Sequence, residues 1–489
     1  MAFLERNANR GSISTGYDID NSVKLEDTNT EYLQRPASGS DGDRRTMTLS
    51  MWIKRTQPGN DHIFYSQGSH VRFRWKSSDY FSLRLASGHE FEHQARKFRD
   101  PNAWYHLVVA IDTTQGTASN RVKIYWNGVQ ETTLPDENNP PDQNEELTLG
   151  QFSSVTTQVG WFVESGYGLD GYIAEVNYID GIQQAVTEFG EFDEDSGIWK
   201  PKKYTGSYGS EGFYLNFDNS SSMGADSSGN GNNFNLNNVS AADQATDTPT
   251  NNFATLNPLH KYSGTSSHNP TFKEGATRWT TGRAAYWAAG IANIGLTSGK
   301  WYFEAQPGSS NSHITVIGYG DESDLVDWAQ DGSDTNGFPG EGGTNSVGYT
   351  GSDTSSDYGK VELGTGSSSN VNANYTQSNI VGVALDVDNG YAYFARDNTY
   401  VNSGNPGSGA SGTGGYALTD TTTTRTGTVF PGIGGYYHTA PAIINVNFGG
   451  YTTISISSAA TDENGYGTFE YAPPTGYYAL CTKNLAEYG

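Results

Sequence analysis

Cysteine and basic residues are both scarce in this chain of 489 residues. The single cysteine, Cys481, excludes an intramolecular disulfide framework. Lys and Arg number 29 against 54 Asp and Glu, and the net charge of −25 repels nucleic-acid backbones and anionic membrane surfaces. We therefore predict no nucleic-acid partner, and a stability that comes from burial and strand pairing.

Long hydrophobic runs are missing as well. No stretch reaches the roughly 18 apolar residues that would cross a bilayer. The opening MAFLERNANRGS lacks the apolar core of a secretory signal. We expect no membrane insertion and no export signal.

Turn-forming residues and aromatic strands are abundant instead, with 60 Gly and 31 Tyr. The stretch TMTLSMWI, residues 46–53, alternates with a period of two, which is typical of a half-buried strand. Between Ala103 and Gln130 two strands precede Asn127-Gly128, the strongest short signal of a hairpin turn. Similar strands recur after about Pro258, whereas long helical patterns do not.

The chain length and this pattern predict an all-β protein with two large domains, since domains usually hold about 100 to 200 residues. We expect two tandem β-sandwiches, over residues 1–217 and 271–489. The first includes an N-terminal arm and the second a C-terminal extension. Residues 218–270, rich in Asn, Ser, Asp and Gly, read as an ordered surface loop that leads into a linker.

Several stretches resemble known domain families. MWIKR, WYHLVVAID, RVKIYWNGV and LDGYIAEV resemble the concanavalin A-like jelly rolls of the laminin-G-like kind. GKWYFEAQ, VGVALDVDNGYAYFARDN and FPGIGGYY resemble a SPRY-type domain, a relative of the same jelly-roll family. These resemblances imply that both sandwiches are concanavalin A-like jelly rolls.

The sequence segments around these domains resemble structural proteins of marine tailed bacteriophages. The stretches are FGEFDEDSGIWKPKKYTGSYGSEGFYLNF, DSSGNGNNF, DTPTNNFATLNPL and APPTGYYALCTKNL. The resemblance implies a non-enzymatic virion protein, in a tail fibre, an appendage or a head decoration, with other virion proteins and host cell-surface polysaccharide as partners. It also implies assembly in the host bacterial cytoplasm, release by lysis, and a homotrimer, the usual state of phage fibres. The lack of disulfides fits assembly in a reducing cytosol.

Two other functions stay open at this point. One is a polysaccharide depolymerase built on a jelly-roll fold. The other is a free lectin-like adhesin of a bacterium, which the missing export signal disfavours.

The motif H-E-x-x-H occurs at His89, Glu90 and His93, and on a helix it binds zinc in metalloproteases. The alternation of FSLRL just upstream favours a strand. On a strand the two imidazoles would lie roughly 13 Å apart, too far to share a metal ion. We predict a strand that ends before the turn RDPNAW, with His89, Phe91, His93 and Ala95 on one face and Glu90, Glu92, Gln94 and Arg96 on the other, and no zinc site.

The acidic stretch GEFDEDSG places Glu191, Asp193 and Asp195 at alternate positions, like the carboxylates of jelly-roll glucanases. A retaining glycosidase needs its two carboxyl groups about 5 to 5.5 Å apart, and Asp195 is shorter by one methylene than the expected Glu. We interpret this stretch as a solvated acidic loop. No catalytic residue is predicted, and no arrangement of Ser or Cys suggests a nucleophile.

Calcium is the one cofactor that the sequence leaves open. Asp386 and Asp388 lie beside Asn389-Gly390, and Asp226 opens the loop DSSGNGNN. Jelly rolls often hold calcium with loop carboxylates, but Asp and Asn also form turns without any metal.

Aromatic side chains on loops can stack on sugar rings. The candidates are Trp328 and the cluster Tyr436, Tyr437 and His438, all in turn-rich segments. Packing at the rim of a sandwich, or against a neighbouring subunit, explains the same residues.

Overall fold

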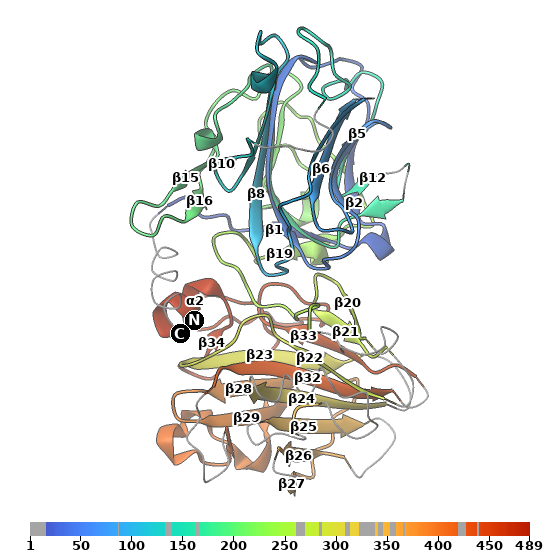
Figure 1. Cartoon of the computed structure of the whole chain (residues 1–489). Helices are drawn as coiled ribbons and strands as arrows, with labels where there is room; N and C mark the ends of the chain where they lie inside the picture. Colours follow the sequence, from blue (N-terminus) through green and yellow to red (C-terminus); the bar gives the residue numbers. More distant parts are fainter. Residues whose placement is uncertain are drawn as a thin grey trace. The chain divides into compact units, whose positions relative to one another are not determined.

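The computed structural model describes residues 16–489 except 87, 133–138, 163, 165, 261–268, 283–285, 309–312, 322–337, 341–345, 353–357, 365–366, 419–426 and 438–439. The chain divides into two compact units, and the division falls between Asn252 and Phe253. Each unit is built from two packed β-sheets (Figure 1). We call the units the first and the second sandwich.

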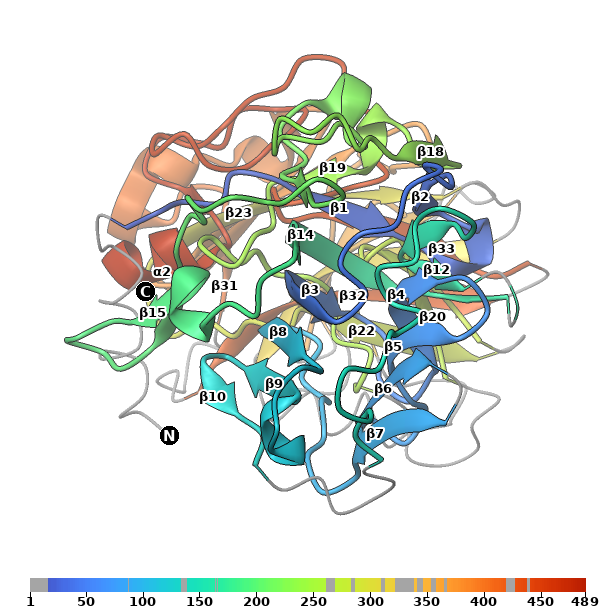
Figure 2. The same ribbon diagram turned by 90° about the horizontal axis from the view of Figure 1, so that it is seen from above.

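The first sandwich contains sheets A and B. Sheet A has the order β10 (Val129–Gln130), β9 (Val122–Trp126), β8 (Trp104–Asp112), β3 (Thr46–Arg55), β14 (Gly171–Asp180), β1 (Ser22–Leu25) and β19 (Gln244–Ala245), with β17 (Phe213–Leu215) also on β14. Sheet B has the order β18 (Asn235–Asn237), β2 (Tyr32–Arg35), β11 (Thr157–Val159), β4 (His62–Gln67), β5 (Val71–Trp75), β6 (Phe81–Ala86) and β7 (His89–His93). Figure 2 shows β8 and β9 in one layer and β5, β6 and β7 in the other.

Two short hairpins and several 3-10 turns complete the first sandwich. The hairpins are β12 (Trp161–Phe162) with β13 (Tyr167–Gly168), and β15 (Gly190–Phe192) with β16 (Trp199–Pro201). The turns are Asp27–Asn29, Ala118–Asn120, Val186–Glu188, Ser220–Ser222 and Ala241–Asp243.

The core of the first sandwich lies between its two sheets. In β5, Val71, Phe73 and Trp75 are fully buried in this core, and the arginines between them point to the opposite face. Every second side chain of a strand points the same way, so the sequence alternation fixes which face is apolar. The predicted hairpin turn is confirmed, since Asn127 and Gly128 connect β9 to β10, both with positive φ, of 48° and 78°.

The second sandwich contains sheets C and D around a core of its own. Sheet C has the order β20 (Thr271–Lys273), β21 (Arg278–Thr280), β33 (Ile443–Asn447), β23 (Lys300–Pro307), β28 (Val381–Asp386), β29 (Tyr391–Arg396) and β30 (Thr399–Tyr400), with β31 (Tyr416–Ala417) on β29 and β34 (Tyr478–Ala479) on β23. Sheet D has the order β22 (Trp287–Ile291), β32 (Val429–Tyr437), β24 (His313–Asp321), β25 (Val347–Ser352), β26 (Lys360–Leu363) and β27 (Ser367–Asn370). Its helical segments are the 3-10 stretches Val401–Ser403 and Pro406–Ser411 and the helix α2 (Thr482–Tyr488).

The prediction of an all-β chain with two jelly-roll sandwiches is confirmed. The predicted strand at residues 46–53 is present in β3, but its half-buried character is wrong. All of its residues except Thr46 are buried, because β3 is central in sheet A and other segments cover the outer face of that sheet. Among the described residues, no helix is long and apolar enough to span a membrane.

The assignment of residues 218–270 to a loop and linker is also wrong in part. β18 pairs with β2, and β19 pairs with β1, so residues 235–245 extend both sheets of the first sandwich. Asp247 is buried and receives a hydrogen bond from Lys54 of β3. Leu256 belongs to the core of the second sandwich. Polar composition did not prevent order here, because Asn and Asp side chains bond to backbone groups.

Candidate functional site

A row of polar side chains crosses the outer face of sheet B, one from each strand. Direct cross-strand pairing joins them in the order Glu90, Arg84, Arg72, Ser66, Gln158, Gln34 and Asn235. Their sequence neighbours, such as Phe73, Leu83 and Phe91, lie in the core. Because neighbours on a strand point to opposite faces, these seven residues face outward. We call them the polar row.

The middle of the polar row is covered by the β12–β13 hairpin. Ser66 Oγ donates a hydrogen bond to the carbonyl of Trp161 at 2.7 Å, and the Trp161 ring stacks on Tyr32 at 5.6 Å. Gln158 Nε2 donates to Gln34 Oε1 at 3.1 Å. Ser66 and Gln158 are buried, so this part of the row supports the hairpin.

The end of the row over β5, β6 and β7 is open and rich in arginine. We define the arginine site as Arg72, Arg74 and Arg84 together with Glu90. Arg72, Arg74 and Glu90 keep 21%, 14% and 24% of their side chains exposed. Glu90 Oε1 lies 3.5 Å from Arg74 and 3.8 Å from Arg72. Among the described residues, no carboxylate lies within 4.0 Å of Arg84.

The wall of the arginine site is aromatic. The guanidinium of Arg72 lies 6.0 Å from the centre of the Phe162 ring. Tyr167 is directly opposite Phe162 in the hairpin, and 48% of Tyr167 is exposed. An exposed phenol on the hairpin that packs on Arg72 can hold a sugar ring, because the ring stacks while its hydroxyls bond to charged groups.

The carboxylates of this face are arranged as ion-pair partners. Glu92, two residues after Glu90, receives hydrogen bonds from Lys76 at 2.8 Å and from Tyr80 at 3.1 Å. Burial alone would raise its pKa, but the contacts with Lys76 and Tyr80 outweigh burial and lower the pKa of Glu92. A glycosidase's general acid needs a raised pKa, so Glu92 is poorly suited to that role.

The H-E-x-x-H motif forms strand β7, as predicted, with Phe91 in the core and Glu90 on the outer face. The strand ends at His93, so the predicted continuation to Arg96 is wrong, because the chain turns there. His89 Nε2 lies 2.8 Å from Glu145. His93 Nδ1 lies 3.0 Å from Glu131 without the alignment of a hydrogen bond. The two histidines therefore have separate carboxylate partners. Within the described residues no group of three or more His, Cys, Asp or Glu could hold a metal ion.

The acidic stretch at residues 190–197 is only partly a loop. Glu191 lies in strand β15, which pairs with β16, and its side chain is 3.4 Å from Lys200. Asp193 receives hydrogen bonds from the backbone and the hydroxyl of Ser196, and these bonds lower the pKa of Asp193 to about 2. The interpretation as a loop is wrong for Glu191, because pairing with β16 extends the chain there.

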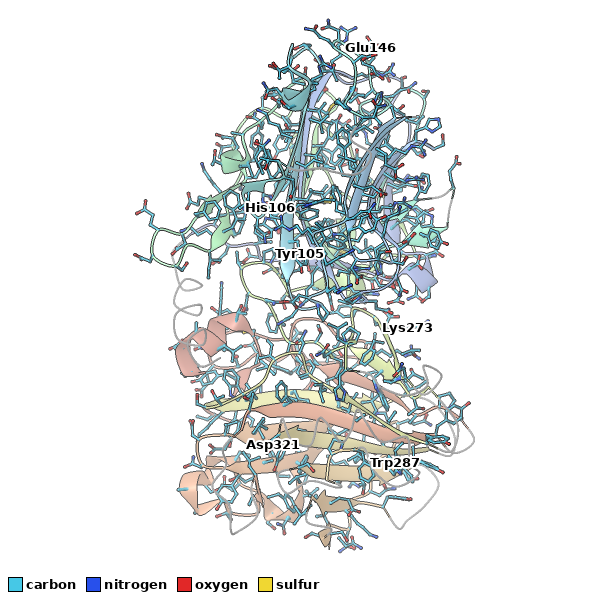
Figure 3. The ribbon with its side chains drawn as sticks, viewed as in Figure 1. Tyr105, His106, Glu146, Lys273, Trp287 and Asp321 are labelled. Atoms are coloured by element: carbon cyan, nitrogen blue, oxygen red, sulfur yellow. The ribbon has the colours of Figure 1, made fainter. Side chains whose placement is uncertain are left out.

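Ser50 and His106 form a buried pair on the outer face of sheet A. Figure 3 shows His106 in the first sandwich. The indole of Trp199 donates to His106 Nδ1 at 2.9 Å, so Nε2 of the neutral ring carries the proton and donates to Ser50 Oγ at 2.9 Å. Burial lowers the pKa of His106 to about 3. This histidine cannot take the serine proton, so the pair lacks the arrangement of an activated nucleophile.

The calcium candidates have protein partners in the structure. The carboxylate of Asp226 accepts hydrogen bonds from the backbone amides of Tyr214, Ser228 and Asn232. Asp386 bonds to Asn389 and pairs with Lys300 at 3.1 Å, and Asp388 accepts from Gly299. These contacts stabilise turns, and calcium binding stays a prediction.

Two of the four aromatic and histidine candidates, Trp328 and His438, lie outside the described residues. Tyr436 and Tyr437 end strand β32 and are partly buried, which differs from the expected turn. The Tyr436 ring lies 5.5 Å from Trp287, which stacks on Phe338 at 3.9 Å. Figure 3 shows Trp287 in the second sandwich. Tyr436 therefore belongs to an aromatic cluster at an edge of sheet D.

Comparison with protein families gives a match in the first sandwich. The model for the concanavalin A-like lectin/glucanases superfamily, Laminin_G_3, matches residues 27–183. This range contains every strand of sheet B except β18. The first sandwich thus has a concanavalin A-like fold. The comparison with curated protein sequences gives no match.

Solved structures with some similarity to this chain include two SPRY-type domains and one protein described as carbohydrate-binding. The SPRY domain of human HERC1 is 13% identical, with a TM-score of 0.27 and coverage of 39% of this chain and 96% of the other. The PSpry domain of TRIM65 is 10% identical, with a TM-score of 0.27 and coverages of 40% and 88%. A protein from Bacteroides ovatus described as carbohydrate-binding is 14% identical, with a TM-score of 0.30 and coverages of 45% and 59%. At such scores these likenesses carry no argument about function.

Sequence reasoning did not find the polar row. The signal was present in VRFRW and FSLRL, where arginines alternate with core residues. An arginine opposite a core face is usually an ordinary surface residue, however. Only the register between β5, β6 and β7 shows that three of them meet.

Proposed function

We propose that this chain is a non-enzymatic structural protein of a bacteriophage particle, in a tail fibre, an appendage or a head decoration, and that its first sandwich binds host surface polysaccharide. The observation that carries the binding part is the partly exposed end of the polar row, where Arg72 lies against Phe162 and the cross-strand partner of Phe162, Tyr167, is exposed. The concanavalin A-like family match, whose description includes lectins, supports it. The virion part rests on the resemblance of the connecting segments to phage structural proteins.

Mass spectrometry of purified, washed particles tests the virion part. The protein is expected among their components at a fixed ratio to the major capsid protein. Its absence from washed particles would refute a structural role and favour the free adhesin.

Binding of the full-length chain to polysaccharide extracted from host cells tests the second part. Tyr167→Ala is expected to weaken binding about fivefold, since stacking contacts of this kind contribute about 1 kcal/mol. Phe192→Ala is the matched control, because Phe192 is also half-exposed, at 50%, on the other short hairpin. Equal losses in both variants would mean that Tyr167 has no specific role.

The depolymerase alternative is tested on the same polysaccharide. Glu90 lies in the arginine site and Glu92 follows it on the same face of β7, and both have cationic partners. We expect no release of oligosaccharide products. Product release that disappears in Glu90→Gln or Glu92→Gln would show an enzyme and refute the non-enzymatic proposal.

A further inference from the structure

The arginine site has more cationic donors than anionic partners. Arg72 and Arg84 are directly opposite each other on β5 and β6. Side chains in such pairs start about 4.5 to 5.5 Å apart at Cβ, and like charges in this position destabilise a sheet. An anion between the two guanidinium groups would offset their mutual repulsion.

The chain itself supplies that anion incompletely. Glu90 Oε1 lies 3.8 Å from Arg72 and 3.5 Å from Arg74, beyond the roughly 2.7 to 2.9 Å of a charge-assisted hydrogen bond. Asp61 is 3.9 Å from Arg74. The Nε–H of Arg72 is buried and has no acceptor in the described part of the chain. For Arg84, the hydrogen bond within the described residues runs from Nε to the carbonyl of Ala86 at 3.3 Å.

The neighbouring positive charges affect the pKa of Arg72. Burial lowers the pKa of the Arg72 guanidinium, and the positive charges of Arg74 and Arg84 lower it further, against the opposing effect of Glu90. An arginine remains protonated under these conditions, so the strain is electrostatic repulsion rather than loss of the proton. A bound anion would relieve that repulsion.

The charge of the whole chain makes this cluster unusual. A net charge of −25 repels polyanions at long range, so general electrostatic attraction cannot recruit one. An anion that binds must be recognised by short-range contacts at the arginine site. This favours a ligand that carries a negative charge and also fits the arginine site through short-range contacts.

We propose that the arginine site binds the oxyanion of an acidic sugar, a uronate carboxylate or a sulfate ester, which bridges Arg72 and Arg84 while the sugar ring lies against Tyr167. The inference rests on the proposed glycan-binding function and adds the chemical class of the ligand. Guanidinium groups match such oxyanions with paired N–H donors, and the phenol ring gives the sugar an apolar surface.

Calorimetric titration of the full-length chain with three oligosaccharides tests the class. The probes are an alginate oligomer for uronates, a sulfated galactan oligomer for sulfate esters, and maltohexaose as the neutral sugar. Either acidic probe is expected to bind more tightly than maltohexaose, and the tighter of the two identifies the oxyanion. Arg84→Gln and Arg72→Gln are each expected to weaken that binding about ten- to hundredfold, the range of a hydrogen bond to a charged group.

Two further variants control the interpretation. Arg45→Gln removes an exposed arginine just before β3 in sheet A and is expected to leave binding unchanged. Glu90→Gln removes the carboxylate that competes for Arg72 and Arg74, and is expected to tighten binding of the acidic probe severalfold. Should Arg84→Gln fail to fold, Arg84→Lys replaces it. Lysine keeps the charge without the paired donors, so part of the affinity should be lost.

The outcomes separate this inference from the function on which it rests. Binding of maltohexaose as tight as that of the acidic probes, with Arg84→Gln unchanged, would overturn the acidic ligand and leave glycan binding intact. No binding of any probe or of host polysaccharide would overturn both. Binding of a single-stranded oligonucleotide as tight as that of the sugars would overturn the sugar class.

Discussion

The two sandwiches have the same architecture, but the outer faces of sheet B and sheet D carry different kinds of residue. Across sheet B of the first sandwich the polar row presents long side chains. The matching row across sheet D of the second runs Ile291, Gly432, Gly318, Gly348, Glu362 and Ser368. Its glycines leave room for the chain itself, since a Cβ on Gly348 would lie 2.1 Å from the carbonyl oxygen of Pro339. One face can offer groups to a ligand, whereas the glycines of the other accommodate a loop.

The comparison teaches that side-chain length decides what a sheet face can do. Long arginine side chains keep their charged ends partly exposed, and glycine lets backbone approach within contact distance. The perturbations below affect one sandwich each, and hydrogen exchange measured on peptides from each sandwich reports which one loses stability.

The largest effect is expected from Asp247→Ala in the first sandwich. The carboxylate of Asp247 lies 2.6 Å from Lys54 Nζ and receives a bond from Trp104, and both charges are buried. Its removal leaves a buried ammonium without its counter-charge, which destabilises by about 3 to 5 kcal/mol. Denaturant unfolding measures the change. The exposed pair of Arg45 and Glu146 is the control, and Glu146→Ala should cost less than about 1 kcal/mol.

A pH effect of similar size is expected from Glu175, on the outer face of sheet A. Tyr17 and Tyr214 donate hydrogen bonds to it at 3.1 and 2.6 Å, but burial dominates and raises its pKa from 4.5 to about 7. The unfolded chain releases this proton near pH 4.5 and the folded chain keeps it until about pH 7. Stability therefore falls as pH rises through this window, by roughly 3 kcal/mol in total, and is level above it.

Glu175→Gln checks this sign. The variant should match the unmodified chain near pH 4 and exceed it in stability at pH 8, as measured by denaturant unfolding at both values. Equal pH dependence of the two proteins would show that Glu175 does not keep its proton in the fold.

A smaller effect is expected in the second sandwich from Gly348→Ala. The added methyl group would meet Pro339 O at 2.1 Å and a methyl of Val316 at 2.4 Å, so the loop or the strand must move. Overpacking of this kind costs about 1 to 3 kcal/mol. Hydrogen exchange should accelerate in sheet D and stay unchanged in sheet B. Gly407→Ala, whose methyl would meet only Asn405 Oδ1 at 3.3 Å, should be close to neutral.

The smallest effect on stability is expected from Tyr167→Ala. Half of this side chain is exposed, at 48%, so its removal should change the free energy of unfolding by no more than about 0.5 kcal/mol. The same variant should lose glycan binding, which separates a binding residue from a packing residue. A large drop in the melting temperature would instead assign Tyr167 to the support of the hairpin.

The strands were the part of the fold that local patterns predicted well. Period-two alternation marks strands such as β3 and β7, and an Asn-Gly pair needs positive φ whatever lies around it. Boundaries were predicted less well, because the polar stretch after Asp218 looks like a linker. Asp226 and Asn232 order it through hydrogen bonds to backbone groups that are distant in the sequence. The aromatic candidates were chosen from composition, and Tyr436 turned out to pack on Trp287.

The sequence by itself determined the positions of strands such as β3 and β7, the apolar face of β7, and the acidic, disulfide-free character of the chain. These properties depend on residues next to one another. Only the tertiary structure decided that Arg72 and Arg84 face each other, that Glu90 is a poor partner for both, and that the hairpin of Phe162 and Tyr167 packs on Arg72. Those relations depend on register between strands and on where a hairpin folds back, and both are fixed by packing of the whole sandwich.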